Sequence, residues 1–162
     1  MIRNSFSKKI TLVYTLVFAI IFVSSGFYIS STLQQRALAR FKESLTVQTR
    51  LATEIVIPLF ARKAKRESIH DLAHRLGEIT GSRVTVIEAS GEVVGESERR
   101  LEDLPLIENH AGRPEIREAL QGKTGFSIRW SETIKKEMYY CAVPLKSNNQ
   151  ILGVLRMSLP LT

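Results

Sequence analysis

The feature that most constrains this chain is a stretch between residues 10 and 35 that contains no charged side chain. Its first part, residues 10–29, reads ITLVYTLVFAIIFVSSGFYI. About 20 residues of helix at 1.5 Å per residue cover roughly 30 Å, which is the hydrocarbon thickness of a bilayer. We therefore expect a transmembrane helix over residues 10–32.

The same stretch has a second interpretation, a cleavable signal peptide. A basic tail over residues 1–9 precedes the apolar run, and Val23-Ser24-Ser25 resembles a cleavage site. However, the apolar run continues past that site through residues 26–29, and no break separates it from the helical pattern that follows. This continuity favours an uncleaved anchor in the inner, cytoplasmic membrane.

The orientation of this anchor does not follow from charge alone, because both flanks are basic. Three positive charges lie in the tail, residues 1–9, and the other flank carries Arg36, Arg40, Lys42 and Arg50. A short basic tail ahead of a first span usually stays in the cytoplasm, and long domains that follow are translocated largely regardless of charge. We expect a cytoplasmic tail at residues 1–9 and an extracytoplasmic domain at residues 33–162 of a single-pass protein.

Composition limits the possible partners. The formal net charge is +7, which for a membrane-tethered domain is explained by attraction to anionic lipid headgroups or envelope polymers. Basic and aromatic residues do not interleave as they do where bases stack, so a nucleic-acid partner is not expected. Cys141 is the only cysteine, which excludes an internal disulfide, and we expect it to be a small buried side chain.

A helical pattern continues beyond the apolar stretch. Its apolar positions share one narrow stripe: Leu33, Ala37, Phe41, Leu45, Leu51, Ile55 and Leu59. We expect one helix to about Ile57, which Pro58 ends or kinks. A helix with such a stripe packs on its own domain or pairs with a copy of itself, so a homodimer is expected.

From residue 69 a short helical pattern ends near Gly77, and the period then changes to two. Strands are expected at residues 83–88, 93–95, 126–131, 138–145 and 151–159, with turns at residues 89–92 and 146–150. In the third strand Phe126, Ile128 and Trp130 alternate with polar residues, which predicts that they form its buried face. The fold class expected is α+β, a five-stranded antiparallel sheet with its helices packed on one side.

Residues that suggest catalysis at first sight do not form a complete motif. His70 and His74 share a helix face and could hold a metal, but no third ligand is placed with them. His70-Asp71-Leu72 resembles the start of a histidine-kinase phosphorylation box, but the arginine and proline expected next are absent, and no glycine-rich nucleotide loop follows. We expect no catalytic residue, metal site or cofactor, and the chain by itself is not expected to be an enzyme.

Residues 108–125, ENHAGRPEIREALQGKTG, combine a structural and a possible functional pattern. Pro114 is suited to the first position of a two-turn helix, and Gly122 is suited to its end. Asn109, His110 and Arg113 cluster at the helix entrance, where an arginine and an imidazole would suit a carboxylate or phosphate-like group. The alternative is a local network that caps the helix and ties the loop to the sheet.

Several short motifs follow one another in order between residues 80 and 162. They are a loop (Asn109, His110, Arg113, Pro114, Glu115), a helix end (Ala119, Leu120, Gly122, Gly125), and three strands (Arg129, Ser131, Thr133; Tyr140, Ala142, Pro144; Gly153, Val154, Arg156, Pro160, Leu161). In this order they resemble the extracytoplasmic sensor region of membrane sensor histidine kinases of the phosphate-regulon type. Before residue 80 the likeness is one of layout only.

This resemblance implies a PAS-like or single-Cache sensor fold for the domain. We expect a homodimeric, membrane-anchored sensor, and its candidate ligand-binding residues are Asn109, His110, Arg113, Arg129 and Tyr140. The ligand would be a small molecule or an envelope component. The family implies a second span and a kinase core after residue 162, so we expect the chain to be the input part of a protein-histidine kinase.

Two other functions stay open on the sequence. One is a ligand-free module that dimerises or docks a partner protein. The other is the sensor domain of a chemoreceptor or a cyclase.

Overall fold

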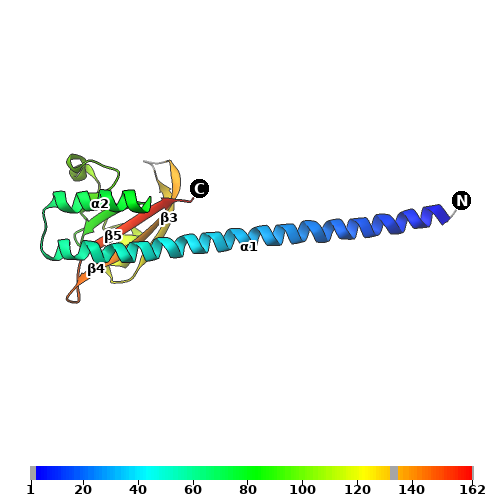
Figure 1. The fold of residues 1–162 in the computed structure, drawn as a ribbon, viewed down its shortest axis with the longest axis horizontal. Helices are drawn as coiled ribbons and strands as arrows, with labels where there is room; N and C mark the ends of the chain where they lie inside the picture. Colours follow the sequence, from blue (N-terminus) through cyan, green and yellow to red (C-terminus); the bar gives the residue numbers. More distant parts are fainter. Residues whose placement is uncertain (1–2, 132–134, 162) are drawn as a thin grey trace. The chain divides into compact units, whose positions relative to one another are not determined.

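The computed structural model describes residues 3–131 and 135–161 of the chain (Figure 1). The elements follow the order α1 (Arg3–Ala61), α2 (Arg66–Thr80), β1 (Arg83–Glu88), β2 (Val93–Glu96), the 3₁₀ helix η1 (Leu101–Leu106), α3 (Pro114–Leu120), β3 (Gly125–Ser131), β4 (Lys136–Ser147) and β5 (Gln150–Pro160). Each strand expected from the alternating pattern is present, with its ends moved by at most two residues.

The chain divides into two compact units, Met1–Phe41 and Lys42–Thr162. Among the described residues, one helix is long and apolar enough to cross a membrane, by length and composition only. Its large apolar side chains, among them Phe18 and Phe22, are exposed. The membrane span at residues 10–32 and the domain boundary at residue 33 stay predictions.

Helix α1 continues past Pro58 and ends at Ala61, so the end expected near Ile57 is wrong by one turn. Proline lacks the N–H that would bond back along the helix, but a single missing bond does not stop the chain from completing a final turn. The Arg62 N–H donates to the Pro58 carbonyl at 3.3 Å, and the Ala64 N–H donates to the Leu59 carbonyl at 2.9 Å.

The second unit contains a five-stranded antiparallel sheet in the order β2-β1-β5-β4-β3. The last strand of the chain lies in the centre, where β5 pairs with both β1 and β4. The predicted fold class, a long N-terminal helix followed by a five-stranded antiparallel α+β domain, is confirmed.

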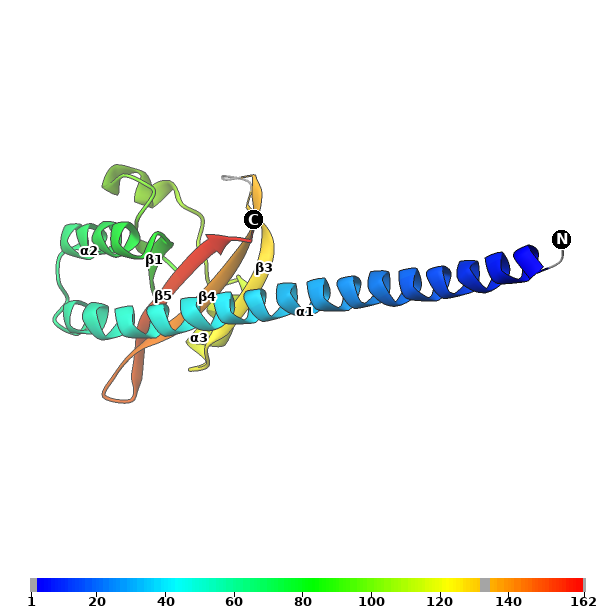
Figure 2. The ribbon, with the colours of Figure 1, turned by 45° about the vertical axis from the view of Figure 1, so that its right-hand side comes forward.

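The final turns of α1 and the whole of α2 cover one face of the sheet, and they lie side by side in Figures 1 and 2. The Cys141 thiol of β4 lies 3.9 Å from the Thr46 hydroxyl of α1. Gly95 of β2 allows Ile69 of α2 to approach, because an added Cβ would lie 3.1 Å from the Ile69 carbonyl oxygen. Cys141 is buried, as its place in a strand predicts.

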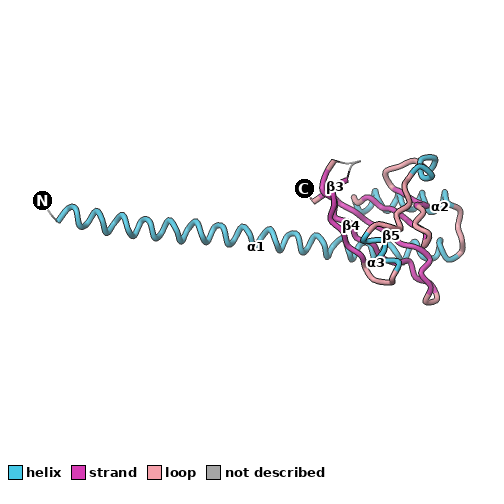
Figure 3. The backbone as a smooth tube through the Cα atoms, turned by 180° about the vertical axis from the view of Figure 1, so that it is seen from behind, coloured by secondary structure: helices cyan, strands magenta, loops and turns pink. Residues whose placement is uncertain are grey.

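Helix α3 packs on the opposite face of the sheet (Figure 3), and η1 contributes to the cover of that face through Leu104. Ile116 and Ala119 of α3 and Leu104 of η1 share a fully buried apolar cluster with Ile87 and Ala142 of the sheet. The expectation that all helices pack on one side therefore holds for α1 and α2 only. The segment between β2 and α3 is long enough to fold back over the second face, and its apolar residues supply the cover there.

The predicted buried face of β3 is wrong. Phe126, Ile128 and Trp130 are exposed by 44%, 47% and 54%. The register pairs Phe126 with Cys141, so these side chains lie on the α1 side of the sheet. Because β3 is an edge strand and α1 lies over β4, no described element covers them. Apolar and polar residues do alternate between the two faces of β3, but alternation alone does not determine which face another element covers.

This correction predicts a mild effect of substitution on β3. We expect Ile128→Thr to change the free energy of unfolding by less than about 0.5 kcal/mol, as for other surface positions. Chemical denaturation of the full chain in detergent micelles measures this change. A loss above about 1 kcal/mol would mean that Ile128 is covered in solution.

Candidate functional site: an arginine-lined cavity

A cavity of about 550 Å³ lies on the sheet face that carries α3 and η1. Its walls come from four strands, β1, β3, β4 and β5, and from the segment between β2 and α3. The lining residues are Arg83, Arg99, Asp103, Leu106, Ile107, Glu108, His110, Arg113, Arg129, Trp130, Ser131, Tyr140 and Arg156. Five of these thirteen side chains are guanidinium groups, so the cavity is suited to an anion.

Strand register brings the inner residues of this cavity together. Arg156 of β5 pairs with Ala142 of β4 and with Thr85 of β1, and Tyr140 lies one pleat away on the same face of β4. Ser127 of β3 pairs with Tyr140, which places Arg129 on that face as well. Two arginines and a tyrosine from three adjacent strands therefore point toward the same space.

Glu115, in the first turn of α3, holds two of the arginines. Its Oε1 accepts a hydrogen bond from Arg129 Nη2 at 2.8 Å and one from Arg156 Nη1 at 3.5 Å, and the side chain is fully buried. Gly125 permits this arrangement, because a Cβ at that position would collide with the Glu115 carbonyl oxygen. The close approach of α3 to β3 thus sets the position of the carboxylate.

The Tyr140 ring packs against the same two guanidinium groups. Arg129 Cζ lies 4.1 Å from the ring centroid, and Arg156 Cζ lies 5.1 Å from it. Cations at these distances are attracted to the ring face. Arg156 is fixed further because its Nη2 donates to the Thr85 hydroxyl at 3.0 Å. These contacts hold Arg129, Tyr140 and Arg156 in place before a ligand binds. Together with His110, Arg113 and Glu115, these residues form the inner wall of the cavity.

Several polar atoms of the inner wall have no partner. Among the described residues, the Arg113 guanidinium makes no hydrogen bond or ion pair, and Arg129 Nε, Arg156 Nε and His110 Nδ1 are buried without a hydrogen-bond partner. Buried polar groups in native proteins are nearly always satisfied. Of these groups, the half-buried Arg113 guanidinium lines the cavity and is accessible to a bound ligand.

Burial and mutual repulsion change the pKa values of these groups. Burial lowers the pKa of Arg156 to about 10, and the positive charges of Arg113 and Arg129 act in the same direction. Burial and the Arg129 charge also lower the pKa of Arg113. Burial together with the charges of Arg156 and Arg113 lowers the pKa of His110 to about 3. At neutral pH the arginines are charged and the imidazole is neutral.

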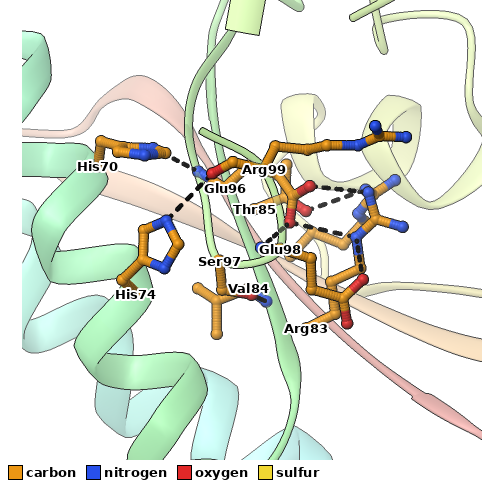
Figure 4. Close-up of polar contacts among 10 residues, drawn as sticks. His70, His74, Arg83, Val84, Thr85, Glu96, Ser97, Glu98 and Arg99 are labelled. Atoms are coloured by element: carbon orange, nitrogen blue, oxygen red, sulfur yellow. Dashed lines mark hydrogen bonds and ion pairs between the residues drawn. The ribbon is translucent and has the colours of Figure 1, made fainter. Parts of the chain in front are cut away.

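The outer rim of the cavity is fixed through a polar network (Figure 4). Arg83 Nη2 donates to Glu96 at 2.8 Å, and Arg83 Nε lies 3.6 Å from Glu98. Burial alone would lower the pKa of Arg83, but the hydrogen bond and charge of Glu96 raise it above its ordinary value. This arginine is therefore already compensated by carboxylates of its own domain.

His70 and His74 connect helix α2 to this rim. Glu96 N–H donates to His70 Nδ1 at 3.4 Å, and His74 Nε2 donates to the Arg99 carbonyl at 3.1 Å (Figure 4). Burial lowers the pKa of His70, with a smaller effect of His74, which favours the neutral ring that this bond needs. Among the described residues no group of three metal-ligand side chains occurs. Through these two hydrogen bonds, His70 and His74 attach the segment after β2 to helix α2.

Four of the five residues singled out from the sequence line the one cavity: His110, Arg113, Arg129 and Tyr140. The fifth, Asn109, does not line it. Its side chain donates to the Ser90 carbonyl at 3.0 Å and accepts from the Ala111 N–H at 2.9 Å, so it ties the loop to the β1–β2 turn. The capping alternative thus describes Asn109, whereas Arg113 makes no side-chain cap to α3.

Sequence reasoning did not assign Arg156, Glu115, Arg83 or Arg99 to this site. A signal for Arg156 is present, because a charged residue interrupts a strand that is largely free of charge. Arg156 shares its face with Val154 and Ser158, both buried, so it points into the protein and needs a partner there. No comparable signal marks Glu115, which by sequence is only an acidic residue in a first helical turn.

No protein-family model matches the chain, and no curated protein sequence matches it. Three solved structures with a similar fold are sensor domains. The sensor domain of the V. cholerae histidine kinase DctB is 17% identical, with a TM-score of 0.63 over 78% of this chain and 51% of that one. The sensor domain of the E. coli protein DcuS is 15% identical, with a TM-score of 0.57 over 74% of this chain and 90% of that one.

A third similar structure is the sensory domain of the Campylobacter jejuni chemoreceptor Tlp3 with isoleucine bound. It is 13% identical, with a TM-score of 0.64 over 80% of this chain and 56% of that one. The chain thus spans about half the length of the DctB and Tlp3 structures. At these identities the likeness establishes the fold of a sensor domain, which occurs in both histidine kinases and chemoreceptors.

Proposed function

We propose that this chain is the extracytoplasmic input module of a membrane sensor histidine kinase and that it binds a small ligand with an anionic group. The observation that carries this proposal is the convergence of Arg113, Arg129 and Arg156 on one cavity, with buried donor atoms that have no partner. Sensor domains of histidine kinases share the fold. The chain has no catalytic role in this proposal.

The finer parts of the proposal rest on the sequence. The order of short motifs supports a relationship to kinases of the phosphate-regulon type. The uncharged stretch at residues 10–35 supports a membrane anchor, and the apolar stripe along α1 supports a homodimer. In this arrangement a ligand acts only if its affinity differs between two states of the domain.

The Arg113→Ala variant tests the sensing function. In a chimera, residue 162 is joined to the second span and kinase core of a host sensor kinase, and phosphorylation of the host regulator is measured in cells moved from minimal to rich medium. We expect the unaltered chimera to respond several-fold and the variant to give one constant output. Arg113 is half-buried and unpaired, so the fold should be retained.

Arg117→Ala is the matched control, because Arg117 is an exposed arginine of the same helix and does not line the cavity. This control should respond as the unaltered chimera does. A normal response from Arg113→Ala would contradict a sensing role for the cavity. Loss of folding in Arg113→Ala would instead support a capping role.

A second candidate function, docking of a protein partner without a ligand, is favoured by one observation. Phe126, Ile128 and Trp130 of β3 are exposed on the α1 side of the sheet, and Val47 and Leu51 of α1 are exposed as well. An exposed apolar patch such as the one along β3 often marks a protein interface. In the same chimera, Ile128→Asp would then abolish the output while Arg113→Ala leaves it unchanged.

A further inference from the structure

The inner wall of the cavity carries more positive than negative charge. Arg113, Arg129 and Arg156 surround a single carboxylate, Glu115, and both ion pairs of that carboxylate use its Oε1. Arg156 is 3% exposed and Glu115 is fully buried. His110 is neutral and adds no charge. Among the described residues, the inner wall therefore has two guanidinium charges without a counter-charge.

The acidic residues of the rim do not supply this missing charge. Glu96 and Glu98 compensate Arg83. Glu108 is exposed and Asp103 is half-buried, so water screens their effect on the inner wall. A charge that is partly removed from water without a partner is unfavourable, since the lost hydration is not repaid. Counted over the described residues, the inner wall lacks two negative charges.

We propose that the ligand of this cavity is a small dianion, either a dicarboxylate or a phosphate monoester, whose two negative charges are paired with Arg113, Arg129 and Arg156. This inference rests on the proposed sensing function and adds the ligand class to it. The planar guanidinium of Arg113, which has no partner among the described residues, receives one oxygen pair in a bidentate contact. The guanidinium groups of Arg129 and Arg156, which line the same cavity, pair with the remaining oxygens.

The excess of two positive charges on the inner wall disfavours two other classes of ligand, monocarboxylates and zwitterionic amino acids. A monocarboxylate would leave one buried guanidinium unpaired. A zwitterionic amino acid brings one negative charge to the inner wall, and its ammonium group would have to reach Asp103 or Glu108 at the rim. A dianion compensates the inner wall without any contact at the rim.

Trp130, the only tryptophan of the chain, follows Arg129 on β3 at the edge of the cavity with its side chain on the α1 side of the sheet, so it reports on binding through changes in that strand. The full chain in lipid nanodiscs is titrated with succinate and with glycerol phosphate at constant ionic strength, and tryptophan fluorescence and the midpoint of thermal unfolding are followed. Monomethyl succinate, which has the shape of succinate and one charge, is the matched ligand control. Isoleucine and asparagine represent the amino acids.

We expect one of the two dianions to bind at least about tenfold more tightly than monomethyl succinate and the amino acids, because one charge-assisted contact is lost with each missing charge. Arg113→Ala should weaken this binding by a similar factor, and Arg117→Ala should not. Preference for succinate assigns the dicarboxylate class, and preference for glycerol phosphate assigns the phosphate monoesters.

Three results would overturn the dianion assignment: no binding of either dianion, equal binding of monomethyl succinate, or tighter binding of an amino acid. None of these results by itself contradicts the sensing function, which the chimera tests without any chosen ligand. A constant output of the unaltered chimera, together with tight binding of a dianion, would contradict the sensing function alone.

Discussion

Replacing Glu115 with alanine is expected to lower the free energy of unfolding by about 3 to 5 kcal/mol, the range for a buried ion pair that loses one partner. The variant leaves Arg156 and Arg129 without their only carboxylate among the described residues. Arg156 cannot move to solvent, because it is held between buried strands with a hydrogen bond to Thr85. Denaturant unfolding of the full chain in micelles measures the change.

Two further variants test whether the loss of stability arises from the buried charge of Glu115. Glu118→Ala changes an exposed acid of the same helix and should alter stability by less than about 0.5 kcal/mol. Glu115→Gln retains a hydrogen-bond acceptor without the charge, so its effect should lie between the other two. A loss below about 1 kcal/mol in Glu115→Ala would show that the arginines are solvated, which would also remove the basis for the dianion.

When the pH drops from about 7.5 to about 4.5, the free energy of unfolding is expected to fall more in the wild-type chain than in the His110→Asn variant. The difference between the two losses should be about 2 to 3 kcal/mol. The pKa of His110 is about 3 in the folded protein because the ring is buried beside Arg156 and Arg113, whereas in the unfolded chain it is about 6.5. The unfolded state therefore binds a proton first, and stability declines from about pH 6.5 down to about pH 3.

The asparagine variant isolates this contribution, because it cannot titrate while every other ionisable group is common to both proteins. Midpoints of denaturant unfolding at a series of pH values provide the comparison. Parallel curves for the two proteins would mean that the His110 imidazole is accessible to water, in conflict with its 4% exposure. Above about pH 7.5 the difference should be constant, since the ring is then neutral in both states.

Part of the candidate site follows from local pattern, whereas Arg129 and Tyr140 enter it only through the family resemblance. Proline at the first position of α3 and the polar residues before it marked the loop that carries His110 and Arg113. The strand that carries Arg129 and the strand that carries Tyr140 were both identified from alternation. Glu115 could not be assigned, because its role depends on partners 14 and 41 residues away along the chain.

Local pattern predicts the five strands and the helices α2 and α3, because periods of 3.6 and 2 are properties of a single segment. It does not predict η1 or the exact end of α1. Only the tertiary structure decided which face of β3 is covered, since alternation defines two faces but not the element that packs on either. Only the sheet order, with β5 between β1 and β4, brought Arg156 to Thr85, Tyr140 and Glu115 and so created a cavity with excess positive charge.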